Sequence, residues 1–254
     1  MKHVAMRMMS TRIKDLPYGC PGFGDIVHSC LLTYGYGLKH QQPATLHIAP
    51  HQYNKKKSIT WKQVINLFPK DSLFLQVHNF GTLNDEQFLK SLQQKYPDAL
   101  LHYYEKYPGK IQNVLQPSFF VDNFVNIFPC FKYETNPGIN LPEKFVTAQF
   151  DAGSKKRLLT PEQLQKITER WRSKGYEIIT VGGGAKDERL KQAPYVGYAM
   201  SKSEAHLGVD SGYMHLSQCY YQPNKIFIYT NRPWEKWEHH LKMFKDYGCV
   251  INDY

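Results

Sequence analysis

The second half of the chain repeats one arrangement three times: a short apolar run that ends in a polar loop containing glycine. The runs end at Phe150, Val181 and Val209, and the loops cover 151–157, 182–188 and 210–215. A helix-like stretch separates the first two runs and another follows the third, and strands that alternate with helices usually pair in parallel. The pattern therefore predicts an α/β domain whose loops after the strands lie along one edge of a parallel sheet.

The first half predicts the same plan. Across the chain the expected strands are 2–9, 44–48, 72–77, 100–104, 144–150, 176–181, 203–209 and, as the last clear one, 225–229. The expected helices are 25–40, a stretch from residue 58, 84–96, 160–175 with Thr160 as its cap and Pro161 at its first position, and 212–220.

An aromatic stretch with regularly placed prolines, 117–142, separates the two halves. Its Asn136-Pro137-Gly138 and Leu141-Pro142 are turn or linker signals. We therefore expect an N-terminal Rossmann-like domain over 1–133, a linker over 134–144 and a C-terminal Rossmann-like domain over 145–254. The phenylalanines of the stretch are more typical of packing at a domain junction than of a binding site.

Several function classes are disfavoured by composition. No apolar run approaches the roughly 18 residues that a membrane span needs, and the charges of Met1–Arg7 do not fit a secretory leader. We expect a cytoplasmic protein; association with the inner face of a membrane, or the host cytoplasm for a viral protein, are the alternatives. The 5 cysteines form no C-x-x-C pair, so we expect buried free thiols rather than a zinc site or a disulfide framework.

Positive charge is concentrated in the first half. Residues before 134 include 15 basic and 8 acidic side chains, against 17 and 14 in the remainder, and the total formal charge is +10. Such a surface favours anionic partners such as phosphorylated glycan, nucleic acid or a membrane. A solvated basic loop is the simpler explanation for Lys55-Lys56-Lys57 taken alone.

Four loops at the expected carboxyl ends of strands are candidate ligand sites, namely 22–25, 153–157, 182–188 and 210–215. A NAD-binding fingerprint is weak, because Val27 occupies the third glycine position and no acid follows at the usual distance of about 20 residues. Gly182–Gly184 also lacks that spacing, and no Walker lysine-serine pair exists.

Asp210-Ser211-Gly212 suits a phosphate group, since main-chain N–H groups at the start of a helix bind anions. Lys155, Lys156 and Arg157 could supply positive charge. For each feature alone a structural role is the alternative: Asp210-Ser211 as a helix cap, His215 as a packed helix residue, and Asp25 as a plain N-cap rather than an acid that faces a cleft.

Taken together, these motifs resemble the bacterial lipopolysaccharide heptosyltransferases and their relatives. Gly22-Phe23-Gly24-Asp25-Ile26-Val27-His28-Ser29 is similar to the family's opening Gly-x-Gly-Asp-x-x-His, and Gly208-Val209-Asp210-Ser211-Gly212-x-x-His215-Leu216 to its Gly-x-Asp-[Ser/Thr]-Gly-x-x-His signature. Val181–Glu188 is similar to the glycine-alanine-acid loop of the second domain. The match covers about residues 20–50 and 145–230, and the chain is short for this family.

The resemblance implies a GT-B glycosyltransferase with two Rossmann-like α/β domains facing across a cleft. It implies Asp25 as general base, His28 on the acceptor side, and a nucleotide-sugar donor bound without a metal or a further cofactor. The absence of any Asp-x-Asp in the sequence agrees with metal independence. The implied donor-binding residues are Gly24, Lys156, Arg157, Gly183, Gly184, Glu188, Asp210, Ser211, Gly212 and His215.

The sequence leaves the acceptor open between an anionic glycan or lipid core and a base in DNA, as in small phage enzymes. A nucleotide-sugar-binding module without catalysis is a second class, although it would not need Asp25. The segment Trp234–His240 has no counterpart in the family, and we expect it to pack as a helix on the first domain rather than to form a site.

Overall fold

The computed structural model divides the chain into two compact units, Met1–Val125 and Asn126–Tyr254. The residues it describes are 2–6, 23–48, 74–81, 83, 85–102, 137–152, 155–231, 244–245 and 248–253. The helix expected from residue 58, most of the aromatic stretch and the segment 234–240 lie outside the described residues. The linker expected over 134–144, with the domain limits on either side of it, stays a prediction.

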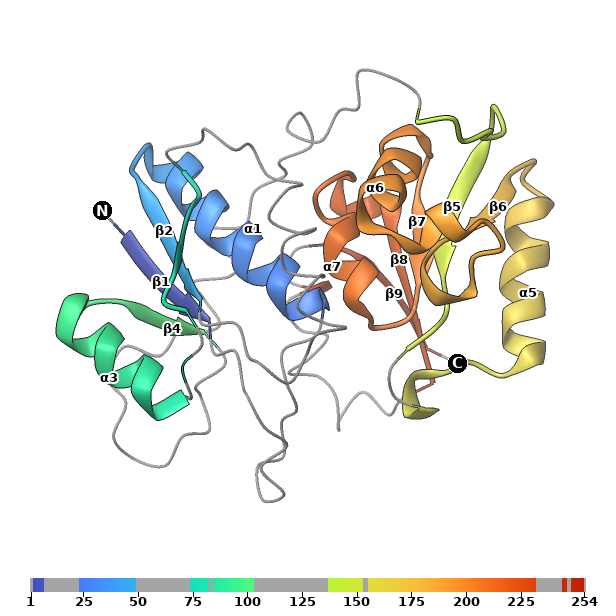
Figure 1. Ribbon diagram of the computed structural model, residues 1–254. Coiled ribbons are helices and arrows are strands. Elements are labelled where there is room, and N and C mark those ends of the chain that lie inside the picture. The colour runs from blue at the N-terminus through green and yellow to red at the C-terminus, as the bar shows by residue number, and fades with distance from the viewer. Residues whose placement is uncertain are drawn as a thin grey trace. The chain divides into compact units, whose positions relative to one another are not determined.

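A four-stranded parallel sheet is the centre of the first unit (Figure 1). Its order is β3-β2-β1-β4, and all of its strand pairs are parallel. The five residues of β2 are all buried, as is typical of strands inside parallel sheets. The strands are β1 (Lys2–Met6), β2 (Ala44–Ile48), β3 (Gln76–Asn79) and β4 (Leu100–His102).

Two helices are described in this unit, α1 (Phe23–His40) and α3 (Asp85–Lys95). One buried stripe of α1 is formed by Val27, Leu31 and Tyr34, at the spacing expected for one face of a helix. Because α1 begins at Phe23, Asp25 is the third residue of the helix. The alternative that Asp25 is the N-cap of α1 is therefore wrong.

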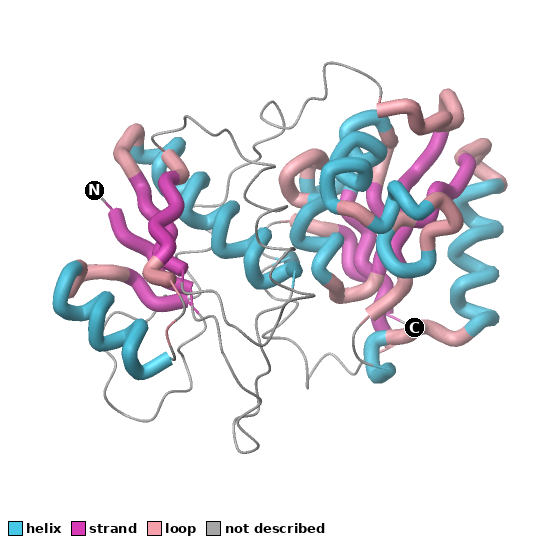
Figure 2. The backbone as a smooth tube through the Cα atoms, viewed as in Figure 1, coloured by secondary structure: helices cyan, strands magenta, loops and turns pink. Residues whose placement is uncertain are grey.

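A five-stranded parallel sheet forms the second unit, in the order β6-β5-β7-β8-β9. Figure 2 shows its strands in magenta with cyan helices on both sides. The strands are β5 (Phe145–Gln149), β6 (Glu177–Thr180), β7 (His206–Gly208), β8 (Ile226–Thr230) and β9 (Val250–Asp253). The helices are α5 (Pro161–Arg172), α6 (Ala193–Lys202) and α7 (Gly212–Ser217), with 3₁₀ turns η2 (Lys155–Arg157), η3 (Gly182–Gly184), η4 (Glu188–Lys191) and η5 (Pro223–Lys225).

Helices cover both faces of this sheet (Figure 1). On one face, Ile167 and Trp171 of α5 pack with alternate strand residues such as Val146 and Leu207. Thr147 lies between Val146 and Ala148 and so points to the other face, where it contacts the segments that follow α6 and α7. Thr160 caps α5 in a capping box with Gln163, which confirms the predicted start of this helix.

Some element predictions are wrong. The strand expected at 72–77 is β3, which runs from Gln76 to Asn79. The strand over 225–229 is not the last one, because β9 pairs in parallel with β8 and has only two apolar residues to signal it. The helix α6 was not anticipated, since Pro194 and Gly197 break its pattern; Pro194 is tolerated because it lies in the first turn.

Candidate functional site

Strand order gives each unit a topological switch point, the place where successive strands are added to opposite sides of the first strand. In the first unit β2 and β4 lie on the two sides of β1, and in the second unit β6 and β7 lie on the two sides of β5. Ligands of open parallel sheets bind beyond the carboxyl ends of the strands at such points. The switch point of the second unit lies between the loops that follow β5 and β7.

Arg157 and Asp210 connect these two loops. Arg157 Nη1 donates to the main-chain oxygen of Asp210 at 3.0 Å, and Arg157 Nε lies 3.8 Å from Asp210 Oδ2. The Arg157 side chain remains 34% exposed, and a guanidinium has five N–H groups. The guanidinium of Arg157 therefore retains N–H donors that can bind an anion beyond the edge of the sheet. The sequence-predicted Arg157 and Asp210 are thus brought together, whereas the side chain of Lys156 lies outside what the structure describes.

A second connection runs through Gln149, the last residue of β5, whose side chain is 4% exposed. Its Nε2 donates to the main-chain oxygen of Asp151, and its Oε1 accepts from the Ser211 hydroxyl. One buried amide therefore holds the loops after β5 and β7 in a fixed relation. Sequence reasoning missed Gln149, although an amide at the end of a mostly apolar strand was a signal.

The loop after β6 lies against the same residues. Gly182 has φ +80°, and a Cβ there would lie 3.0 Å from Gln149 Cγ and 3.0 Å from Tyr213 Cε2. Gly183 and Gly184 lie beside the carboxylate of Asp151. The glycines thus allow this loop to approach closely the loops that follow β5 and β7.

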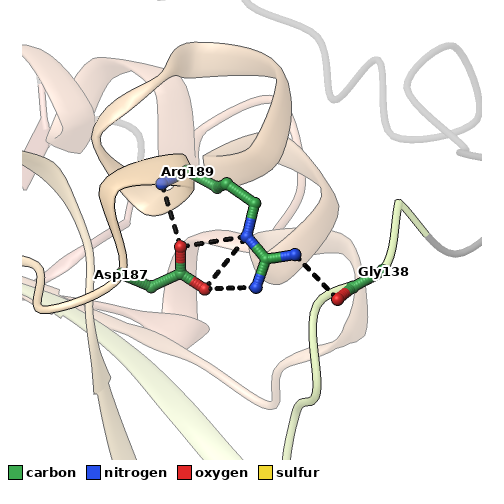
Figure 3. Close-up of polar contacts among 3 residues, drawn as sticks. All are labelled: Gly138, Asp187 and Arg189. Atoms are coloured by element: carbon green, nitrogen blue, oxygen red, sulfur yellow. Dashed lines mark hydrogen bonds and ion pairs between the residues drawn. The ribbon is translucent and has the colours of Figure 1, made fainter.

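Glu188 lies in η4, farther along this loop. Its side chain is 80% exposed, and its carboxylate pairs with Lys191. The neighbouring acid Asp187 caps η4 and accepts from the guanidinium of Arg189, which also donates to the main-chain oxygen of Gly138 at 2.8 Å (Figure 3). The hydrogen bonds from Arg189 lower the pKa of Asp187. These contacts fix the end of the glycine loop to the segment that precedes β5.

Two residues of α7 have defined neighbours. The Tyr213 hydroxyl donates to the main-chain oxygen of Lys191, and burial raises the pKa of Tyr213 to about 12. The ring of His215 packs on Phe244, with centroids 5.0 Å apart. Ser211 is the N-cap of α7 by its backbone, but its hydroxyl bonds Gln149 and makes no cap hydrogen bond. Donor-binding roles for Ser211, Gly212 and His215 remain predictions.

In the first unit, the predicted residues lie in the first two turns of α1. Gly24 is buried, and the side chain of His28 is 4% exposed. The main chain of Asp25 is described as part of α1, but its side chain lies outside what the structure describes. The catalytic role of Asp25 and the acceptor-side role of His28 remain predictions.

A network of polar side chains is buried in the second unit, on the face of the sheet to which Thr147 points. Thr147 Oγ1 lies 3.0 Å from His206 Nδ1 and 3.0 Å from the Tyr221 hydroxyl, which in turn contacts Ser203 Oγ. His206 is completely buried, and this burial lowers its pKa to about 3. The imidazole is therefore neutral near pH 7 and acts as a structural hydrogen-bonding group.

Within the described ranges, no group of three or more His, Cys, Asp or Glu side chains is placed to hold a metal ion. In the same ranges, none of the helices has the length and apolarity needed to cross a membrane. Cys30, Cys219 and Cys249 are buried free thiols, as expected. Cys20 and Cys130 lie outside the described residues.

No family model matches the chain, and no curated protein matches it. Similar solved structures include the bacterial iron-containing dodecameric glycosyltransferase TibC from enterotoxigenic E. coli H10407, with a TM-score of 0.48 and 11% identity over 90% of this chain and 58% of TibC. The E. coli heptosyltransferase WaaC, solved with ADP, gives a TM-score of 0.43 and 9% identity over 100% of this chain and 93% of WaaC. This chain therefore spans less than two thirds of the length of TibC.

Proposed function

We propose that the chain is an inverting glycosyltransferase that moves a sugar from a nucleotide-diphosphate donor to an acceptor hydroxyl without a metal ion. The observation that carries the proposal is the pairing of Arg157 with Asp210 at the switch point of the second unit. The motifs around both residues resemble the donor-binding motifs of the heptosyltransferases. The proposal includes a GT-B fold, with one Rossmann-like domain for the donor and one for the acceptor.

The donor diphosphate is assigned to the second unit. Arg157 offers a partly exposed guanidinium that is already oriented by Asp210, so little side-chain freedom remains to be lost on binding. Charge-assisted hydrogen bonds to phosphate are stronger than neutral ones. Lys156 and main-chain N–H groups near Ser211 and Gly212 would add to this attraction. Positive charge here would stabilise the departing nucleoside diphosphate, which is the role a metal has in other transferases.

The catalytic step is assigned to Asp25 as general base. Its carboxylate would take the proton of the acceptor hydroxyl while the acceptor oxygen bonds to the anomeric carbon of the sugar. The bond from that carbon to the diphosphate oxygen breaks, and the diphosphate leaves with the electron pair. Attack from the face opposite the leaving group inverts the configuration. His28 would lie on the acceptor side of this base.

The acceptor is proposed to be anionic, since the first 133 residues carry 15 basic against 8 acidic side chains. A phosphorylated glycan or lipid core is favoured, and a base in DNA is the alternative supported by the same charge. DNA binding would weaken steeply with salt, with a slope set by the number of phosphates neutralised. A small salt dependence would exclude DNA as acceptor.

A nucleotide-binding measurement tests the donor assignment. In a thermal-shift assay with ADP, GDP, UDP and CDP, only the nucleotide with the matching base should stabilise the protein. A ligand at 100 times its dissociation constant adds about 2.7 kcal/mol to the free energy of unfolding. Arg157→Ala should weaken that nucleotide about tenfold or more, and Arg157→Lys should weaken it less. Arg172→Ala, at an exposed site on α5, is the matched control.

Two results would contradict the proposal. One is the absence of binding by any nucleoside diphosphate or its sugar conjugates. The other is equal affinity in the Arg157 and Arg172 variants. Nucleotide binding without transfer or hydrolysis of any nucleotide-sugar would favour a binding module over an enzyme.

A further inference from the structure

Asp151 is an exposed acid at the switch point of the second unit that the resemblance does not assign. It comes two residues after the end of β5, in the loop that leads to Arg157. Among the described residues, no cation pairs with its carboxylate and no hydrogen-bond donor reaches it. By contrast, the exposed Glu188 carboxylate is paired with Lys191. Asp151 is therefore the better candidate for an acid that is free to accept hydrogen bonds from a ligand.

Two consecutive glycines make room for this carboxylate. A Cβ at Gly183 would lie 3.1 Å from Asp151 Oδ2, and a Cβ at Gly184 would lie 3.0 Å from the same oxygen. Real Cβ atoms are rarely found so close to another atom, so side chains at 183 or 184 would push the carboxylate away. The acid thus lies directly against the glycine loop, at a position that depends on the absence of side chains there.

The main chain of Asp151 is fixed although its carboxylate is free. The Asp151 carbonyl accepts from Gln149 Nε2, and the same amide accepts from Ser211. Gln149 is a positioning residue in this arrangement, because it is buried and its side-chain amide is bonded to Asp151 and Ser211. A pre-oriented group loses little freedom when it binds a ligand.

The chemistry of a free carboxylate limits what it can bind. It only accepts hydrogen bonds, and its two oxygens can accept from two neighbouring hydroxyls at once. It repels a phosphate, so the phosphates of a ligand would lie toward Arg157 instead. The site therefore combines an anion-binding part at Arg157 with a hydroxyl-binding part at Asp151.

We propose that Asp151 contacts the ligand and binds a vicinal diol of a nucleotide-sugar, either that of the ribose or that of the transferred sugar. This inference rests on the proposed function and deepens it. It adds Asp151 to the donor-binding residues that the resemblance implies and gives it the hydroxyl-binding role at this edge.

Calorimetric titration of Asp151→Asn and Asp151→Ala tests the inference. The probes are the tightest-binding nucleoside diphosphate of the four, its 2′,3′-dideoxy form, its glucose conjugate and inorganic pyrophosphate. If the ribose is bound, both variants should lose about tenfold affinity for the ribonucleotide, and none for the dideoxy form. If the sugar is bound, only the glucose conjugate should lose affinity. Pyrophosphate should bind equally well or more tightly, because a negative charge has been removed.

Control variants separate the other outcomes. Glu177→Gln changes an exposed acid at the opposite end of β6 and should leave all four affinities unchanged. Equal losses for every probe would mean that the loop has collapsed, and no loss for any would mean that Asp151 does not touch the ligand; either result overturns the inference. So does a diol-specific loss in Glu188→Gln with none at Asp151. If the unmodified protein binds none of the probes, the proposed function itself fails.

Discussion

In the second unit, buried side chains without a charge hold the loops and strands in place through hydrogen bonds. Gln149 joins two loops through its amide, and Thr147, His206 and Tyr221 form a buried network in the same unit. Buried polar groups of this kind are costly when they lose their partners or gain a charge. The stability of the site is therefore expected to depend on the protonation state of His206.

The lowered pKa of His206 predicts a loss of stability in acid. The unfolded chain takes up a proton near pH 6.5, whereas the folded chain excludes it until about pH 3. The stabilising effect is complete above pH 6.5 and is lost as the pH falls toward 3, at about 1.4 kcal/mol per pH unit. Urea unfolding measures the free energy of unfolding at pH 7 and at pH 5. Between these two values, the free energy of unfolding of His206→Gln should decrease by about 2 kcal/mol less than that of the unmodified protein.

The matched control is His40→Gln, which removes an exposed imidazole at the end of α1. Between pH 7 and pH 5, the free energy of unfolding of this variant should decrease as much as that of the unmodified protein. If that of His206→Gln decreases as much as well, His206 is not the group responsible.

At the scale of elements, some helices and loops pack so closely against their neighbours that only a residue without a side chain fits at the contact. Gly182 allows the loop after β6 to approach Gln149 and Tyr213, and Gly37 allows α1 to approach the chain at Phe74. In isolated helices, alanine is favoured over glycine by about 1 kcal/mol. Tertiary contact can reverse that preference.

Gly37→Ala should therefore destabilise the protein, although it lies in the interior of a helix. A Cβ at this position would lie 2.8 Å from Phe74 Cα, which is a main-chain atom that cannot rotate away. We expect a loss of about 1–3 kcal/mol, the usual cost of overpacking. Thermal unfolding gives the sign directly: a raised melting temperature would show that helix propensity decides at this site instead.

At the scale of the whole molecule, the proposed activity is divided between two parallel sheets. Apart from Gly24, the donor-binding residues are assigned to the second unit, and the general base is assigned to α1 of the first. A change at the base should therefore affect transfer without affecting the donor. This separation is a property of the two-unit organisation and not of either sheet alone.

Asp25→Asn is accordingly expected to reduce the transfer rate by a factor of about 100 or more while the dissociation constant of the nucleoside diphosphate stays within twofold. The two quantities can be measured on the same preparation, by single-turnover transfer and by calorimetry. Full transfer activity in the variant would remove Asp25 from the mechanism. A parallel loss of nucleotide affinity would move Asp25 to the donor side.

The sequence alone determined the α/β class, the parallel pairing, the capped start of α5 and the loops that hold Arg157 and Asp210. These properties depend on the spacing of apolar residues along the chain and on helix caps. Both are determined by residues that are close together in the sequence. Strand order was decided only by the tertiary structure, and with it the switch point that brings Arg157 to Asp210. Gln149, the free carboxylate of Asp151 and β9 also emerged only there, because hydrogen bonds between loops and the pairing of a short terminal strand depend on partners far away in the chain.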